Sequence, residues 1–134
     1  MTSVIEIEGI GPAYADKLEQ SGIATIEALL EKGASPQGRQ ELAEATGISL
    51  ALILRWVNHA DLFRIKGVGS EYSELLEASG VDTVPELAQR NPENLYLKLI
   101  EVNQEKKLVR RPPTQSQVKD WVQQAKQLAR VVTY

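Results

Sequence analysis

The apolar positions of this 134-residue chain recur mostly at helical spacing. Between residues 49 and 64 they repeat at intervals of three, four and seven, at Leu50, Ile53, Leu54 and Val57. Neighbouring apolar side chains, Trp56 among them, widen this stripe so much that we expect the helix to lie in the centre of the molecule. A similar stripe in residues 114–130 predicts a last helix, which Thr114 and Gln117 would open as a capping box.

Start and stop residues divide the rest of the chain into short helices. Proline or a capping Ser, Thr or Asn precedes most of them, and glycine closes several because it tolerates the left-handed conformation. The predicted helices span residues 12–22, 25–33, 35–47, 49–64, 70–79, 83–90, 92–107 and 114–130. No segment shows the alternation typical of a strand, so the sequence predicts an all-α fold.

The chain contains an internal repeat. Ile7-Glu8-Gly9-Ile10-Gly11 returns 58 residues later as Ile65-Lys66-Gly67-Val68-Gly69, and ten of the 24 pairs from 7/65 to 30/88 are identical. Further along, Trp56-Val57-Asn58-His59-Ala60 matches Trp121-Val122-Gln123-Gln124-Ala125 at an offset of 65. We therefore expect two units of four helices, about residues 5–64 and 65–130, which form one compact domain over residues 1–134. The two tryptophans are expected in equivalent places of the core.

Each Gly-x-Gly turn follows an apolar residue and precedes a helix that carries another apolar residue seven positions on. This pattern resembles the hairpin of helix-hairpin-helix domains. Together with the Trp-Val-x-x-Ala helices downstream, nearly the whole chain is similar to a family of bacterial domains of unknown function built from paired helix-hairpin-helix motifs. The resemblance implies two tandem units of this type, and it implies no activity.

In nucleic-acid-binding helix-hairpin-helix domains, the glycine turn brings backbone N–H groups close to a phosphate, and neighbouring Lys or Arg side chains add charge. The resemblance gives the matching positions as Gly9, Ile10, Gly11, Gly67, Val68 and Gly69. Charge separates the two turns, because residues 6–22 sum to −3, whereas residues 64–80 sum to −1 and place a lysine inside the turn. The candidate phosphate-binding turn is therefore Lys66, Gly67, Val68 and Gly69.

The glycines also have an architectural explanation. A turn between closely packed helices can require backbone angles that a side chain would obstruct. On this interpretation Gly9 and Gly11 are structural turn residues, and valine in place of Gly11 or Gly69 would lower the melting temperature. The sequence leaves both explanations open.

Basic residues gather in the second unit. Residues 98–130 hold eight Lys and Arg against three acids, so this segment carries +5 and the rest of the chain −8. The densest group is Lys106, Lys107, Arg110 and Arg111, which precede the last predicted helix. These side chains are either solvated, with two of them offsetting a helix dipole, or they dock phosphate or an acidic protein surface.

Composition narrows the possible chemistry. The chain has no cysteine and one histidine, which excludes thiol nucleophiles, thiolate metal sites and sites with two histidines. That histidine, His59, corresponds to Gln124 in the repeat, which favours a buried hydrogen-bonding group over a catalytic base. No apolar run reaches membrane length, and the start is too acidic for a signal peptide. We expect no catalytic residue, no metal, no cofactor, no membrane insertion and a cytoplasmic location.

Two functions remain as hypotheses. The first is a non-catalytic helical interaction module that binds a protein partner. The alternative is weak, sequence-nonspecific binding of a nucleic-acid backbone through the second turn and the basic loop at residues 106–111. The acidic first turn favours the protein partner, because a phosphate that approaches it meets net repulsion.

Overall fold

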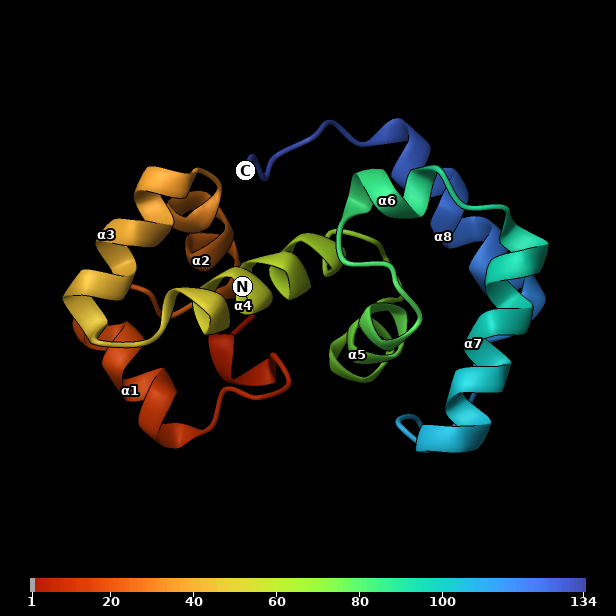
Figure 1. The fold of residues 1–134 in the computed structure, drawn as a ribbon, viewed down its shortest axis with the longest axis horizontal. Coiled ribbons are helices and arrows are strands. Elements are labelled where there is room, and N and C mark those ends of the chain that lie inside the picture. Colours follow the sequence, from red (N-terminus) through yellow and green to blue (C-terminus); the bar gives the residue numbers. More distant parts are fainter. Residues whose placement is uncertain (1) are drawn as a thin grey trace. The chain divides into compact units, whose positions relative to one another are not determined.

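Helices account for most of the chain. The structure is a computed structural model that describes residues 2–134. The elements are η1 (Val4–Glu6, a 3-10 helix), α1 (Pro12–Gln20), α2 (Ile26–Gly33), α3 (Pro36–Thr46), α4 (Leu50–Leu62), α5 (Ser70–Ala78), α6 (Val84–Ala88), α7 (Pro92–Lys106) and α8 (Gln115–Gln127) (Figure 1). No strand forms within residues 2–134, where an isolated bridge joins Ser3 to Thr25. The predicted all-α fold is confirmed.

Side-chain caps explain where most helices begin. Oxygen atoms of the N-cap side chains accept hydrogen bonds from backbone N–H groups of the first turn in α2, α3, α6, α7 and α8. These N-caps are Thr25, Ser35, Thr83, Asn91 and Thr114. The capping box of Thr114 and Gln117 is present as predicted. Helices α1 and α5 differ, because their N-caps are Gly11 and Gly69, which offer no side-chain oxygen.

Two predicted helix ends are wrong. Helix α4 ends at Leu62 and not near Arg64, because a new turn begins there: the Ile65 N–H donates to the Leu62 carbonyl at 3.1 Å. Helix α8 ends at Gln127 and not at residue 130. Its C-cap, Leu128, takes an extended conformation that leads the chain out of the helix.

The chain divides into two compact units. Unit 1 comprises the residues up to Asp61 together with Val131–Tyr134, and unit 2 comprises Leu62–Arg130. The division falls near the predicted boundary after residue 64. Nothing in the repeat predicts that the last four residues belong to unit 1.

In unit 1, helix α3 packs against α1 and α2, and η1 packs against α1. The Trp56 side chain of α4 is fully buried, and its ring centroid lies 5.0 Å from that of Tyr14 in an edge-to-face arrangement. His59 is fully buried as well, as the repeat suggested.

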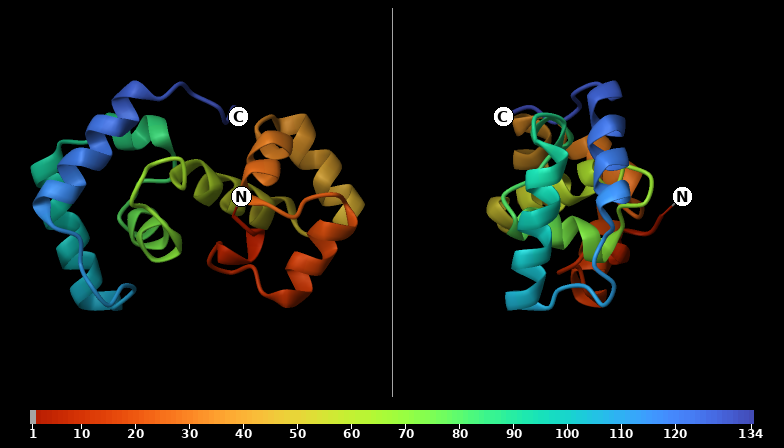
Figure 2. Two further views of the ribbon diagram at one scale, coloured as in Figure 1. Left: turned by 180° about the vertical axis from the view of Figure 1, so that it is seen from behind. Right: turned by 90° about the vertical axis from the view of Figure 1, so that its right-hand side faces the viewer.

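In unit 2, helices α6 and α7 pack against α8, and α5 packs against α7. Both views of Figure 2 show α7 and α8 side by side. The core contains Leu75, Leu76, Leu87, Leu95, Leu99 and Trp121, all 2% exposed or less. Trp121 contacts Tyr72 at a centroid distance of 5.1 Å, so each unit buries its tryptophan against the tyrosine that follows its glycine turn. None of the helices in residues 2–134 is long and apolar enough to cross a membrane.

Candidate functional site

The second glycine turn is held on α8 by a glutamine clamp. The backbone N–H of Lys66 donates to Oε1 of Gln124 at 2.8 Å, and Nε2 of Gln124 donates to the Lys66 carbonyl at 3.1 Å. Nε2 also donates to Oδ2 of Asp120 at 2.8 Å, which fixes the amide group. The clamp leaves the Lys66 side chain exposed while it fixes the backbone that leads into the turn.

The two glycines of each turn meet different demands. Gly9 and Gly67 both adopt φ of +96°, a conformation that residues with a side chain rarely take. A Cβ at Gly67 would also lie 3.2 Å from Nε1 of Trp121. In contrast, Gly11 and Gly69 have extended backbones with φ of −90° and −115°, and no atom lies within 4 Å of an added Cβ. Backbone angles therefore require glycine at the first position of each turn and not at the second.

The basic loop, defined as residues 106–111, lies against the first turn of α5. The hydroxyl of Tyr72 donates to the carbonyl of Arg111 at 2.8 Å. Tyr72 is the third residue of α5, which begins directly after Gly69. The fold thus brings the end of the basic loop beside the helix start that follows the second glycine turn.

A buried asparagine fixes the middle of the same loop. The Val109 N–H donates to Oδ1 of Asn103 at 3.0 Å, and Nδ2 of Asn103 donates to the Val109 carbonyl at 3.3 Å. Asn103 is 9% exposed and Val109 is 6% exposed. The two bonds satisfy both backbone groups of Val109, which anchors the loop to α7.

The loop begins with an unusual backbone conformation. Lys107, the C-cap of α7, has φ of 51° and ψ of 49°, in the left-handed region that glycine or asparagine normally occupies at this position. Its N–H donates to the Asn103 carbonyl at 2.8 Å and closes the helix. This conformation turns the chain out of the helix without a glycine.

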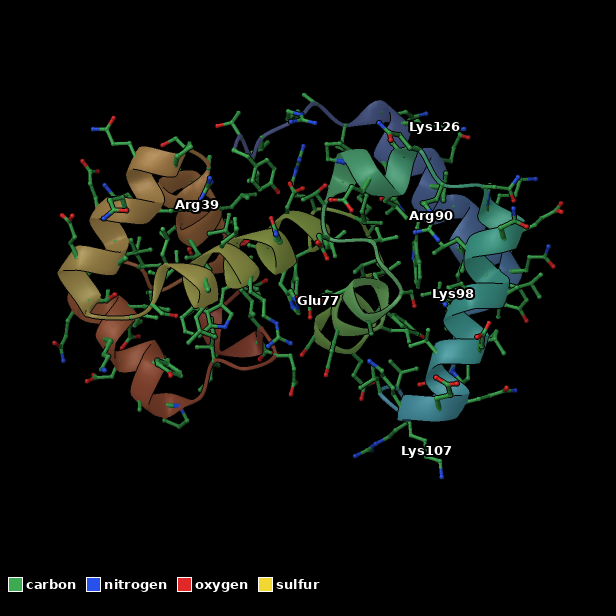
Figure 3. The ribbon with its side chains drawn as sticks, viewed as in Figure 1. Arg39, Glu77, Arg90, Lys98, Lys107 and Lys126 are labelled. Carbon is green, nitrogen blue, oxygen red and sulfur yellow. The ribbon has the colours of Figure 1, made fainter. Side chains whose placement is uncertain are left out.

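The four loop cations are exposed. Solvent reaches the side chains of Lys106, Lys107, Arg110 and Arg111, and Figure 3 shows Lys107 directed outward at the end of α7. The bonds from Tyr72 and Asn103 hold the loop backbone while the charged groups stay available to a partner. A prearranged backbone lowers the entropy lost when such a surface binds.

Lys66 of the second turn lines a surface pocket of about 440 Å³ on unit 2, and no residue of the basic loop lines this pocket. The other lining residues are Arg64, Asp120, Gln124, Gln127 and Leu128. The Arg64 guanidinium donates to the Ala129 carbonyl at 2.7 Å, and Asp120 places a carboxylate among the cations. Among the predicted site residues, Gly69 is therefore the N-cap of α5, the helix that contacts the loop through Tyr72. The backbone of Lys66 is instead hydrogen bonded to Gln124 on α8.

The sequence around the first turn, in unit 1, is acidic. Its carboxylates in residues 6–22 are all exposed: Glu6, Glu8, Asp16 and Glu19. One lysine in this region, Lys17, lies 6.0 Å from the centroid of the Tyr14 ring. An anion that approaches this turn therefore meets an acidic surface.

An exposed ion pair lies elsewhere on unit 1. Lys32 and Glu41 are 2.7 Å apart in a surface pocket of about 500 Å³. The hydrogen bond from Lys32, together with its charge, lowers the pKa of Glu41. Because both side chains are exposed, the pair contributes little to stability.

Asn103 and the contact between Tyr72 and Arg111 were not predicted from the sequence, and only Asn103 carried a signal. Asn103 follows Leu95 and Leu99 at helical spacing, so a polar residue in the apolar stripe of α7 marks a buried hydrogen-bonding group. The bond from Tyr72 to Arg111 spans 39 positions, and no sequence pattern indicates it.

A protein-family profile described as "Domain of unknown function (DUF4332)" matches residues 8–128. The matched range includes both glycine turns, both buried tryptophans and the basic loop. No curated protein and no solved structure matches the chain.

Proposed function

The chain belongs to the DUF4332 family, whose description assigns no activity, and we propose that it is a non-catalytic helical interaction module. In this proposal the basic loop of unit 2 binds an acidic surface of a protein partner. The tandem helix-hairpin-helix organisation and the cytoplasmic location belong to the same proposal and rest on the sequence.

The observation that carries the proposal is the hydrogen bond from Tyr72 to Arg111. Together with the Asn103 bonds it gives the loop a fixed backbone under four exposed cations. Arginine guanidinium groups bind carboxylates through paired hydrogen bonds, and two of the four cations are arginines. A rigid basic loop of this size suits a small cluster of Asp or Glu side chains.

The charges around the loop favour a protein over a nucleic acid. Helix α5, which contacts the loop through Tyr72, carries Glu71, Glu74 and Glu77. The whole chain has a net charge of −3. Nucleic-acid affinity grows with the number of phosphates that are neutralised, and a long polyanion would extend from the loop onto acidic surface.

One observation supports nucleic-acid binding as the second candidate. Helix α5 begins without a side-chain cap at Gly69, and no atom lies within 4 Å of an added Cβ there. Free N–H groups at a helix start attract phosphate. Glu71 lies in the same first turn, however, and its carboxylate competes for those donors.

Two charge variants separate the candidates. The loop variant replaces Lys106, Lys107, Arg110 and Arg111 with glutamine. The control variant replaces four other exposed cations of unit 2 with glutamine: Lys98, Lys119, Lys126 and Arg130. Each variant removes four positive charges, so only the position of the change differs.

We expect weak nucleic-acid binding by the wild-type chain. Three to five neutralised phosphates predict dissociation constants near the nonspecific range of about 10⁻⁴ to 10⁻⁶ M at physiological salt. Fluorescence anisotropy with a labelled duplex and a labelled single strand, at two salt concentrations, measures this. Submicromolar binding that is lost in the loop variant and in Lys66→Glu, but kept in the control variant, would establish the second candidate instead.

A further inference from the structure

The last four residues, Val131–Tyr134, form a non-helical tail that packs within unit 1. The backbone N–H of Thr133 donates to the Ala34 carbonyl at 2.8 Å, just past the end of α2. Figures 1 and 2 both show the tail near α2. This hydrogen bond attaches the tail to unit 1.

A buried arginine receives the tail. Arg39, on α3, is 5% exposed, and Figure 3 labels it there. Its Nη1 atom donates to the carbonyls of Gly33 and Ala34 at 2.8 and 3.2 Å. These bonds orient the guanidinium from within unit 1 and leave Nη2 to donate to the Thr133 carbonyl at 2.7 Å. The receiving group is therefore positioned by contacts that do not involve the tail.

Two of the hydrogen bonds at Thr133 involve its main chain. Both its N–H and its carbonyl are hydrogen bonded, to Ala34 and Arg39. Main-chain bonds of this kind accept many side chains at the bonded residue, as in proteins that bind peptides in extended form. The Thr133 hydroxyl also donates to the Ala34 carbonyl, at 3.3 Å, but that carbonyl already accepts a hydrogen bond from the Thr133 N–H. Position 133 therefore contributes binding affinity mainly through its main chain.

The residues on either side of Thr133 provide selectivity. Val132 is 3% exposed, so its side chain is buried. The Arg39 guanidinium lies over the Tyr134 ring, with 5.5 Å between Cζ and the ring centroid. The Tyr134 hydroxyl donates to Oδ1 of Asn58 at 2.8 Å. This arrangement matches a three-residue segment whose first side chain is apolar and whose third is aromatic, with any residue between them.

We propose that this tail site, defined by Gly33, Ala34, Arg39 and Asn58, is a peptide-binding site. Its ligand is a peptide segment of another chain with an apolar residue and an aromatic residue two positions apart. The chain's own tail occupies the site and competes with such a segment. Residues 128–130, which connect the tail to α8, are exposed, and Tyr134 is 63% exposed, so the tail can leave and rebind. The proposal lies within unit 1 and is independent of the basic loop.

The test uses the full chain and a labelled peptide. The probe is fluorescein-labelled Ala-Arg-Val-Val-Thr-Tyr with an amidated end, which copies residues 129–134 without offering a carboxylate. The receptor is the Val132→Asp variant, in which a charge prevents the chain's own tail from staying buried. Tyr134→Ala, a change at a mostly exposed side chain, serves as a second receptor that retains the fold. Circular dichroism verifies that each receptor is helical.

We expect both variants to bind the peptide at least about tenfold more tightly than the wild-type chain. The reason is that a tethered tail competes at an effective concentration in the millimolar range. Arg130→Gln, which changes the exposed connection alone, should behave like wild type. Peptides with aspartate for the second valine, or alanine for tyrosine, should bind at least about tenfold more weakly. Asn58→Ala in the Val132→Asp background should also weaken binding.

Two results would overturn the proposal. One is that folded variants bind the peptide no better than the wild-type chain does. The other is that the aspartate-containing peptide binds as tightly as the original, because binding would then not involve the tail site.

Discussion

Gly67 and Gly69 lie two positions apart in the same turn, and their local geometry separates their roles. Gly67 combines a positive φ with close approach to the Trp121 indole, whereas Gly69 is an extended N-cap with open space around it. No steric constraint therefore requires glycine at the second position, and its lack of a side chain leaves the first N–H groups of α5 without a side-chain cap. Gly9 and Gly11 show the same contrast in backbone conformation, although a Cβ at Gly9 would lie at an ordinary contact distance of 3.5 Å from Nε1 of Trp56.

Serine substitutions at the two glycines should have different effects. Gly67→Ser forces a side chain into a left-handed conformation and should lower the free energy of unfolding by about 1–3 kcal/mol. Gly69→Ser supplies a preferred N-cap and should change it by less than about 0.5 kcal/mol. Urea denaturation followed by circular dichroism measures both. Equal destabilisation by the two substitutions would contradict the separation of roles.

At the same scale, residue patterns predicted the buried groups better than the exposed ones. The repeat placed Trp56 and Trp121 in equivalent core positions, because large apolar residues at helical spacing have few alternatives to burial. It could not separate Gly67 from Gly69, since both follow the same motif and only backbone angles distinguish them. The burial of Arg39 was not predicted, because its hydrogen-bond acceptors are backbone carbonyls, which every residue type provides.

Among the elements, helix α7 and the basic loop are joined through a strained residue. Lys107 holds the left-handed C-cap position, where an L-residue is destabilised by about 1–2 kcal/mol relative to glycine. The strain persists because the Asn103 and Tyr72 bonds determine the course of the loop that follows. Lysine at this position places a cation at the start of the loop and makes the helix less stable than glycine would.

Glycine at the C-cap should therefore stabilise the chain. Lys107→Gly should raise the free energy of unfolding by about 1 kcal/mol, because glycine takes the left-handed conformation without strain. The neighbouring substitution Lys106→Gly removes the same charge inside the helix and should lower stability by up to about 1 kcal/mol. Equilibrium unfolding in urea compares the pair. Destabilisation by Lys107→Gly equal to that of Lys106→Gly would show that the C-cap is not strained.

Helix order and starts were predictable from the sequence, whereas two of the ends were not. Starts depend on local caps such as Thr114, which the sequence displays directly. The end of α8 is followed by the tail, which leaves the helical path, buries Val132 and bonds through Thr133 to Ala34, distant in the sequence. Local periodicity carries no information about such a contact, so the helix predicted from it continued to residue 130.

For the whole molecule, charge position matters more than total charge. The chain is acidic overall, and its four loop cations are grouped on a loop that is bonded to α5 and α7. The sequence predicted this group and left open whether it was merely solvated, because the bonds that fix the loop come from residues distant in the sequence or buried. The proposed binding function depends on that fixed arrangement.

The most direct test of the proposal is quantitative affinity capture from a lysate of the native host, with nuclease added. Wild-type, loop-variant and control-variant chains are used as baits, and captured proteins are compared by mass spectrometry. We expect a nuclease-resistant partner with an acidic surface that the wild type and the control variant retain and the loop variant loses. Capture that is equal for the loop and control variants, or that disappears on nuclease treatment, would contradict a protein-binding role for the basic loop.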